Sequence, residues 1–366
     1  MSFIVFFKKF FFDSVDILPD YFNHSQKINY IDIGASNIKN LIFFTKYKFI
    51  NLFLFDADKR ALKSYISNFN INTNLNIFDK AVWKKKDRKY FMEYKNQASS
   101  SLFEANIPKL SEYNLGTKLY DLQNKTLCDL DSLDNLLKNY LVDFIKVDTE
   151  GADYEILLGA KKKLKKTLGV YVECQLIERY LGTKSFSEIE LLLRKEGFEI
   201  FSINQEKWTQ SKNYNIDTNI KNVWLDVLFF VDIKTFLGRL KKIKNTEERF
   251  FLIKKIIFLM INFKLHDTSL RYLKFIKSEN LISEINFIKI HRFIKMNTKS
   301  NFKIIALDFF RLILILILIP FVFFFRKKYT SLLIYLIFKN LKNLKRIFSL
   351  KLNNTSIFRN NGLDIN

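Results

Sequence analysis

The fold is decided by the stretch "YIDIGASNIKN" at residues 30–40. Its apolar first half ends in Gly34 and Ala35, which is typical of a strand that runs into a tight turn beside a nucleotide. Dinucleotide sites prefer G-x-G-x-x-G, because several glycines let backbone amides approach a pyrophosphate. This turn has a single glycine, and Asp32 before it would repel a phosphate. The stretch therefore disfavours a dinucleotide such as NAD.

An acidic strand end suits S-adenosylmethionine, because this cofactor has no phosphate and carries an ammonium and a sulfonium group. The next predicted strand ends in "FLFDAD", which places Asp56 24 residues after Asp32, where an acid binds ribose hydroxyls in nucleotide-binding folds. We predict that the cofactor site contains Asp32, Gly34, Ala35, Asn37 and Asp56. The alternative is that Asp32 and Asp56 only cap helices, as aspartate often does.

Strand and helix patterns alternate over residues 28–232. Strands are predicted at 28–33, 51–55, 76–82, 144–147, 170–174, 198–203 and 223–231, with helices between several of them, for instance at 58–70 and 154–166. The alternation predicts an α/β fold, in which helices cover both faces of a parallel sheet and 223–231 joins as an antiparallel edge. Ligands of this fold bind outside the carboxyl ends of the strands.

Two charged residues interrupt the apolar strand in "VDFIKVDTEGADYEILLGAKKKL" at 142–164. Burying a charge is costly unless the charge is paired, so Lys146 is expected to reach a carboxylate. Strand alternation puts Lys146 and Asp148 on one face, where they are able to meet at the carboxyl end. The alternative is that an ion pair of Lys146 with Asp148 or Glu150 only orders the turn at Gly151.

Several motifs resemble those of the FkbM-like methyltransferases and occur in the same order, over roughly residues 28–232. They are "YIDIGASN", "LFDAD", "AVW", "SSSLF", "TLCDLDSL", "IKVDTEGADYEILLGA", "VYVEC" and "LLRKEGFEIFSI". The resemblance implies a Rossmann-like class I fold that uses S-adenosylmethionine for O-methylation, often of sugar hydroxyls on glycans or glycosylated metabolites. The sequence departs from the family pattern at Lys39 in place of a glycine, at Asp56-Ala57 in place of Glu-Pro, and at Asp153 in place of a glutamate.

Methyl transfer to an alcohol requires a base that removes the hydroxyl proton. The three histidines, at positions 24, 266 and 291, lie outside the predicted sheet, which leaves carboxylates and a lysine as candidates. We predict that Asp148 and Glu150 bind the hydroxyl and accept its proton, and that Lys146 orients them.

Ser101 and Glu173 are predicted to line the acceptor side of the pocket, although a plain loop at 99–101 explains the serines equally well. No metal site is predicted, because two acids form no diagnostic metal motif. A divalent cation on Asp148 and Glu150 stays an alternative, since hard metals take oxygen ligands.

The net charge of +23 is concentrated in the C-terminal third: residues 1–240 carry +5 and residues 241–366 carry +18. The same third contains the apolar runs "LILILILIPFVFFF" at 312–325 and "SLLIYLIF" at 331–338. Basic residues beside apolar runs favour an anionic membrane surface, and no nucleic-acid-binding motif is present. We predict a shallow helical hairpin at 304–338 that lies in one leaflet. The alternative is a buried helical pair.

These patterns predict an N-terminal apolar or helical segment at 1–27, a methyltransferase domain at 28–234 and a basic helical region at 235–366. The expected protein is cytoplasmic and peripheral on the inner membrane face, because no signal-peptide pattern is found and the two cysteines form no CxxC pair. Its expected acceptor is a sugar or glycan, which the membrane region would favour as lipid-linked. The alternative is a membrane-associated binding protein whose methyltransferase fold has lost turnover, and Lys39 motivates it.

Overall fold

A computed structural model describes residues 21–22, 26–35, 47–58, 60, 74–113, 116–209 and 220–298. Asn37 and Lys39, most of the predicted helix 58–70, and both apolar runs of the C-terminal third lie outside these residues. The chain divides into two compact units, residues 1–291 and 292–366, and the sheet belongs to the first unit.

Ten strands and nine α-helices are described within these ranges. The strands are β1 (Ile28–Ile33), β2 (Ile50–Asp56), β3 (Asn74–Asp79), β4 (Ala81–Trp83), β5 (Asp87–Tyr94), β6 (Leu122–Ser132), β7 (Phe144–Val147), β8 (Gly169–Gln175), β9 (Phe198–Thr209) and β10 (Ile220–Val231). The α-helices are α4 (Ile107–Leu110), α5 (Leu133–Leu136), α6 (Asp153–Leu158), α7 (Lys161–Leu164), α8 (Phe186–Lys195), α9 (Ile233–Lys242), α10 (Thr246–Asn262), α11 (His266–Ser278) and α12 (Glu284–Thr298), and the short 3-10 helices are η2 (Gln97–Ser99) and η3 (Thr117–Leu119).

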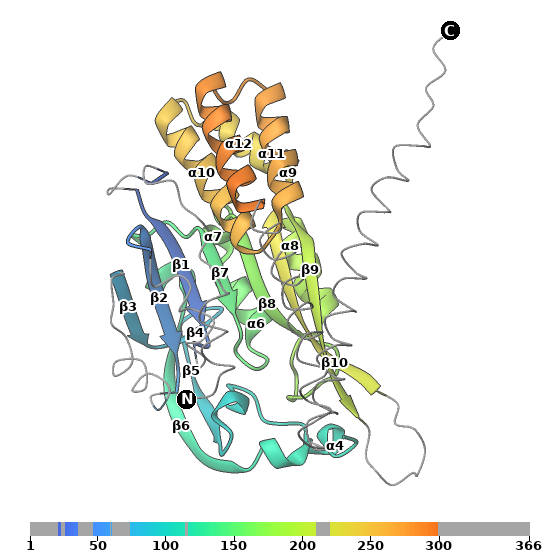
Figure 1. Ribbon diagram of the computed structural model, residues 1–366. Coiled ribbons are helices and arrows are strands. Elements are labelled where there is room, and N and C mark those ends of the chain that lie inside the picture. Colours follow the sequence, from blue (N-terminus) through green and yellow to red (C-terminus); the bar gives the residue numbers. More distant parts are fainter. Residues whose placement is uncertain are drawn as a thin grey trace, which may run out of the picture. The chain divides into compact units, whose positions relative to one another are not determined.

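Seven strands form one mixed sheet in the order β3-β2-β1-β7-β8-β10-β9 (Figure 1). The five strands from β3 to β8 in this order are parallel, and β10 pairs antiparallel with both β8 and β9. The predicted α/β fold with a parallel sheet is confirmed. The strand predicted at 223–231 is antiparallel as expected, but β9 forms the edge and β10 lies inside it.

The sequence patterns missed a second sheet of three strands, in the order β4-β6-β5. The strand predicted at 76–82 is in fact two strands, because β3 joins the large sheet and β4 joins the small one. The helix predicted at 154–166 is likewise divided into α6 and α7. The division falls at Gly159, where a Cβ atom would lie 2.2 Å from the carbonyl oxygen of Trp83, so this close approach requires glycine.

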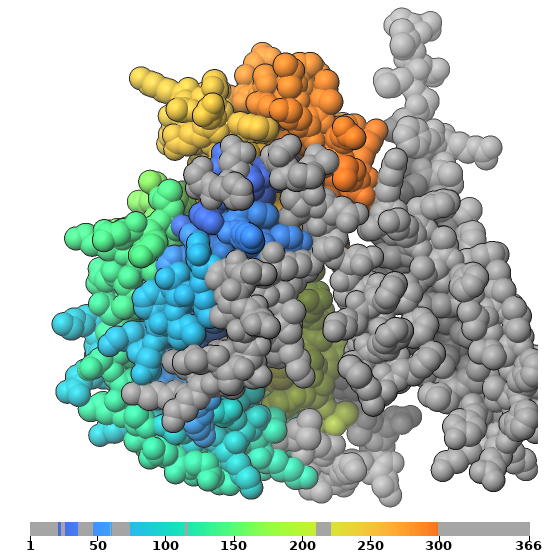
Figure 2. Space-filling model, turned by 60° about the vertical axis from the view of Figure 1, so that its left-hand side comes forward, coloured from blue at the N-terminus to red at the C-terminus, as the bar shows by residue number. Residues whose placement is uncertain are grey.

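Helices α9 to α11 lie at the end of the large sheet where its parallel strands begin (Figure 1), and α10 and α11 appear in yellow and orange at one end of Figure 2. Phe263 stacks on Phe144 of β7, and the Tyr272 hydroxyl donates to the carbonyl of Val231. Phe144 and Tyr272 are fully buried, and Tyr272 also packs against the buried Phe236 of α9, so the three helices share the core of the sheet. None of the described helices is long and apolar enough to span a bilayer.

A buried ion pair fixes α10 to this end of the sheet. The Nζ atom of Lys255 lies 2.7 Å from Asp143 Oδ2, and both side chains are at most 8% exposed. Asp143 also accepts a hydrogen bond from the backbone N–H of Asn29 at 2.8 Å. The carboxylate therefore joins the starts of β1 and β7 to the helix.

We expect Lys255→Met to lower the free energy of unfolding by about 3–5 kcal/mol, because it leaves the Asp143 carboxylate buried without its cation. The double variant Lys255→Met with Asp143→Asn removes both charges and is expected to recover most of this loss. Urea unfolding of the full chain measures both values. Equal stability of wild type and the single variant would show that the pair does not fasten α10.

Candidate active site

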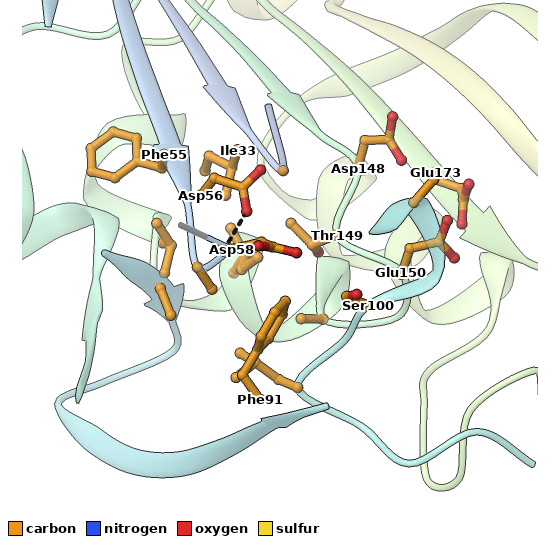
Figure 3. Close-up of a pocket in the computed structure, with 18 of the residues that line it drawn as sticks. Ile33, Phe55, Asp56, Asp58, Phe91, Ser100, Asp148, Thr149, Glu150 and Glu173 are labelled. Carbon is orange, nitrogen blue, oxygen red and sulfur yellow. Dashed lines mark hydrogen bonds between the residues drawn. The ribbon is translucent and has the colours of Figure 1, made fainter. Parts of the chain in front are cut away.

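The carboxyl ends of the parallel strands surround a cavity of about 310 Å³ (Figure 3). Its walls come from the ends of β1 and β2, the start of β4, the loop that contains η2, the turn after β7, and the facing parts of β8 and β10. The lining residues used below are Gly34, Asp56, Asp58, Lys80, Ser100, Asp148, Glu150, Glu173, Trp224 and Asp226. The cavity therefore lies where the fold predicts a ligand.

Gly34 allows the ends of β1 and β7 to meet. Its φ angle is +79°, and a Cβ atom there would lie 1.8 Å from the carbonyl oxygen of Asp148. No side chain fits between two backbones at this distance, so both the conformation and the close approach require glycine. The predicted turn residue Ala35 is buried beside it.

Asp56 provides a buried acid at the end of β2, on the cavity wall (Figure 3). Its Oδ1 atom accepts a hydrogen bond of 2.8 Å from the backbone N–H of Asp58. Burial raises the pKa of Asp56 to about 7, and among the described residues no ion pair holds this carboxylate. A buried carboxylate with acceptor capacity left is a suitable partner for ribose hydroxyls, so the nucleoside part of S-adenosylmethionine fits this wall.

Lys146 joins two acids at the adjacent ends of β1 and β7. Its Nζ atom lies 3.1 Å from Asp32 and 3.1 Å from Asp148. Burial opposes the charge on Lys146, but the two carboxylates raise its pKa well above the usual range. The expectation that Lys146 reaches a carboxylate is confirmed. Among the described residues its ion pairs are with Asp32 and Asp148 and not with Glu150, so its geometry fits the predicted orienting role for Asp148 alone.

The structure places Asp32 behind the cavity wall. Its side chain is 1% exposed and is not among the residues that line the cavity. Burial raises its pKa, although Lys146 acts against the rise. Asp32 was predicted to contact the cofactor, whereas in the structure its carboxylate contacts Lys146. Because Lys146 also contacts Asp148, it connects the two acids.

A second cation, Arg179, was not found from the sequence. It is fully buried and contacts Glu150 at 3.0 Å and Glu173 at a closer distance. Burial raises the pKa of Glu150 to about 7 and that of Glu173 well above its usual range, although Arg179 acts to lower both. The only sequence signal for this residue is a basic side chain in the loop after β8, six residues beyond Glu173, where no strand or helix pattern marks it.

Hydrogen bonds fix the turn that carries Glu150, whose φ angle is +54°. Asp153 accepts from the backbone N–H groups of Thr149 and Gly151 at 3.0 and 3.1 Å. Ser101 donates to the backbone carbonyl of Glu150 at 2.7 Å, and the Tyr180 hydroxyl lies 3.0 Å from the Glu150 carboxylate. Ser101 is fully buried and does not line the cavity, so it supports the turn, and its neighbour Ser100 faces the cavity.

Three of the predicted acids meet at the far wall from Asp56, where Figure 3 shows them side by side. Carboxylate oxygens of Asp148, Glu150 and Glu173 all lie within 4.8 Å of one another. This spacing would suit one cation, but Arg179 already pairs with Glu150 and Glu173. The arrangement gives hydrogen-bond acceptors and a candidate base on one wall, and the buried acid Asp56 on the other.

The cavity lies at the carboxyl ends of the parallel strands of a mixed seven-stranded sheet, where α/β folds bind their ligands. Residues 32–200 match the model of the methyltransferase FkbM domain. The chain therefore carries an S-adenosylmethionine-dependent methyltransferase domain of the FkbM family. The resemblance seen in the sequence motifs is confirmed.

Comparison with solved structures gives methyltransferases at low similarity. The N-terminal domain of EvdMO1 with SAH bound has a TM-score of 0.31 and 8% identity, covering 56% of this chain and 74% of that chain. Precorrin-6y C5,15-methyltransferase of Geobacter metallireducens has a TM-score of 0.29 and 10% identity, covering 57% and 81%. A SAM-dependent methyltransferase of Anabaena variabilis has a TM-score of 0.23 and 12% identity, covering 58% and 79%. The sequence matches none of the curated proteins with which it was compared.

We expect Asp56→Asn to stabilise the protein without ligand. The unfolded carboxyl ionises near its usual pKa of 3.8 and the folded one near 7, so ionisation favours unfolding as the pH rises between these values. Above pH 7 the ionised Asp56 lowers the free energy of unfolding by about 4 kcal/mol. Asn carries no charge and so removes this loss, and its Oδ1 atom is still able to accept the hydrogen bond from the backbone N–H of Asp58. Urea unfolding at pH 4 and pH 8 measures the difference. A gain of stability that is equal at both pH values would contradict a raised pKa at Asp56.

Proposed function

We propose that the domain transfers a methyl group from S-adenosylmethionine to a hydroxyl of a sugar, a glycan or a glycosylated metabolite. The observation that carries this proposal is the wall of three carboxylates opposite Asp56, which suits an acceptor with several hydroxyl donors. When bound, the cofactor supplies an electrophilic methyl group on its sulfonium. Gly34, Ala35 and Asp56 would hold it, with Asn37 as a further predicted contact outside the described residues.

Glu150 is the proposed base. A general base works best when its pKa is near the working pH, and burial raises the pKa of Glu150 to about 7. Its carboxylate is 18% exposed and lines the cavity, so an acceptor hydroxyl is able to reach it. Arg179 and Tyr180 hold the carboxylate in place, which limits the rotation that would otherwise move it away from the hydroxyl.

Asp148 is the proposed partner of the acceptor hydroxyl. Its side chain is 40% exposed, more than any other acid of the wall, and Lys146 fixes one carboxylate oxygen at 3.1 Å. The other oxygen is able to accept a hydrogen bond from the acceptor. Glu173 provides a third wall residue, whose side chain is only 6% exposed.

We expect Glu150→Gln to reduce methyl transfer by about 10²–10⁴-fold, which is the usual contribution of a general base. Affinity for S-adenosylmethionine is expected to stay within a few fold, because Asp56 lies on the other wall. In the wild type the transfer rate should rise with pH through about 7, as Glu150 loses its proton. Transfer to a glycan library and calorimetry with the cofactor measure these values.

Glu112→Gln is the matched control, because Glu112 is exposed and, among the described residues, forms its ion pair with Lys109 one helical turn away. It should leave both transfer and cofactor affinity unchanged. A Glu150→Gln protein that folds, binds the cofactor and transfers methyl groups at the wild-type rate would exclude Glu150 as the base.

We also propose that the basic helices bind an anionic membrane surface. Residues 233–291 contain 13 Lys and Arg against 5 Asp and Glu, and the helices lie at the end of the sheet opposite the cavity. The exposed basic residues are Lys234, Lys241, Lys242, Lys244, Lys264, Arg271, Lys274 and Lys289. A protein held by these helices would direct its cavity away from the lipid, because a strand of six residues alone spans about 20 Å. This arrangement favours the outer end of an extended lipid-linked glycan as the acceptor.

We expect the triple change of Lys241, Lys242 and Lys244 to Gln to weaken binding to anionic vesicles by at most about 3 kcal/mol, and more clearly at low salt. Sedimentation of the full chain with vesicles of phosphatidylglycerol and phosphatidylcholine measures this. The matched control changes Lys84, Lys85 and Lys86, which are also three exposed lysines close together in the sequence but lie between β4 and β5. Equal losses in the two triple variants would mean that total charge, and not this surface, determines binding.

A further inference from the structure

Strand β10 brings an aromatic and an acidic side chain to the acceptor wall. Trp224 and Asp226 are two residues apart, so they lie on the same face of the strand, and both line the cavity. Asp226 is the register partner of Glu173 on β8, and Trp224 is the partner of Gln175. The two residues therefore extend the wall of Asp148, Glu150 and Glu173 along the sheet.

The ring of Trp224 is held in place on two sides. The guanidinium carbon of Arg179 lies 4.2 Å from the ring centroid, a distance typical of a cation–π contact. Trp208 meets the ring edge to face, with centroids 5.5 Å apart and planes at 89°. A ring fixed in this way loses little conformational freedom when a ligand packs against its remaining surface in the cavity.

A fixed indole beside carboxylates matches the two kinds of surface on a sugar ring. The C–H groups of one sugar face are apolar and pack on an aromatic ring by burial and dispersion. The hydroxyls at the ring edge donate to carboxylates, which accept at several positions. Trp224 with Asp226 thus offers a partner for each surface at one place.

The charge of the cavity adds a second constraint. Six acids line it, against Lys80 as the one lining cation among the described residues. These acids are Asp56, Asp58, Asp148, Glu150, Glu173 and Asp226. Arg60, Lys146 and Arg179 pair with them from outside the lining, and Lys146 is shared with Asp32. Seven acids therefore face four cations. Burial raises the pKa of Asp56 and Glu150 to about 7 and that of Glu173 well above its usual range, but even with these three protonated the other four acids balance the four cations. The cavity thus has no excess of positive charge for a negatively charged ligand, and each further carboxyl that ionises repels such a ligand.

We propose that Trp224 and Asp226 form the sugar subsite of the acceptor, and that this subsite takes neutral or amine-bearing sugar rings and rejects sugars with a carboxylate or phosphate. The inference rests on the proposed sugar acceptor and deepens it. Trp224 binds the apolar face of the ring, and Asp226 accepts from its hydroxyls or pairs with an ammonium. The methylated hydroxyl then faces Asp148 and Glu150.

Saturation-transfer NMR of the full chain with bound S-adenosylhomocysteine tests the subsite, with methyl α-glucoside, glucosamine and glucuronate as probes. We expect glucosamine and the neutral glucoside to bind at least about tenfold more tightly than glucuronate. Trp224→Ala should weaken both by about tenfold or more, and Asp226→Asn should weaken glucosamine and reduce the discrimination against glucuronate. Affinity for S-adenosylhomocysteine, measured by calorimetry, should stay within a few fold in each variant.

Tyr90→Ala is the matched aromatic control, because Tyr90 is 55% exposed and does not line the cavity. Trp224→Phe keeps an aromatic ring and should weaken sugar binding less than Trp224→Ala does. It is the variant to measure if Trp224→Ala does not fold. Sugar binding that is unchanged in both Trp224 variants, or glucuronate bound as tightly as glucosamine, would overturn the subsite but leave the proposed methylation intact. Absence of binding by all three sugars at wild type would overturn the subsite and the sugar acceptor together.

Discussion

The two ion pairs of Lys146 hold the ends of β1 and β7 together, and the arrangement of the whole site depends on this junction. β1 and β7 end side by side, and their backbones approach so closely that only Gly34 fits opposite Asp148. This approach also brings the buried Asp32 close to the partly exposed Asp148, and the two acids would repel each other without a cation between them. Lys146 lies 3.1 Å from each. The position of Asp148 on the cavity wall therefore follows from a charge that is buried inside the sheet.

Arg179 has the corresponding role one strand further along. It neutralises Glu150 and Glu173 only in part, since one guanidinium faces two carboxylates in a buried place. The two cations thus divide the acids into two pairs with different properties. The Asp148 side chain is 40% exposed and pairs with Lys146, whereas burial raises the pKa of Glu150 to about 7. A hydroxyl between them would meet an acceptor and a base at once.

The sequence predicted the parts of this arrangement that depend on local pattern. Apolar runs, strand ends and the family motif were sufficient to predict the α/β fold with its parallel strands. They were also sufficient to predict that Asp56 and the acids at 148, 150 and 173 lie at the carboxyl edge of the sheet, because strand periodicity determines which residues reach that edge. Arg179 lies in an irregular loop, so no periodicity indicates that it turns inward. Asp32 and Ser101 are buried and do not line the cavity, which the sequence did not indicate, since periodicity gives the face of a residue but not what covers it.

The excess of acids connects cofactor binding with the base. A positive charge that enters the cavity lowers the pKa of the carboxyls around it, and Glu150 is already near its midpoint at neutral pH. Binding of a cationic cofactor therefore favours the ionised form of Glu150, and by linkage the ionised base favours the cofactor. While the cavity is empty, its buried acids lower the stability of the domain. Binding of a cationic cofactor restores part of this stability. Acids that destabilise the fold are thus retained where their charge is needed.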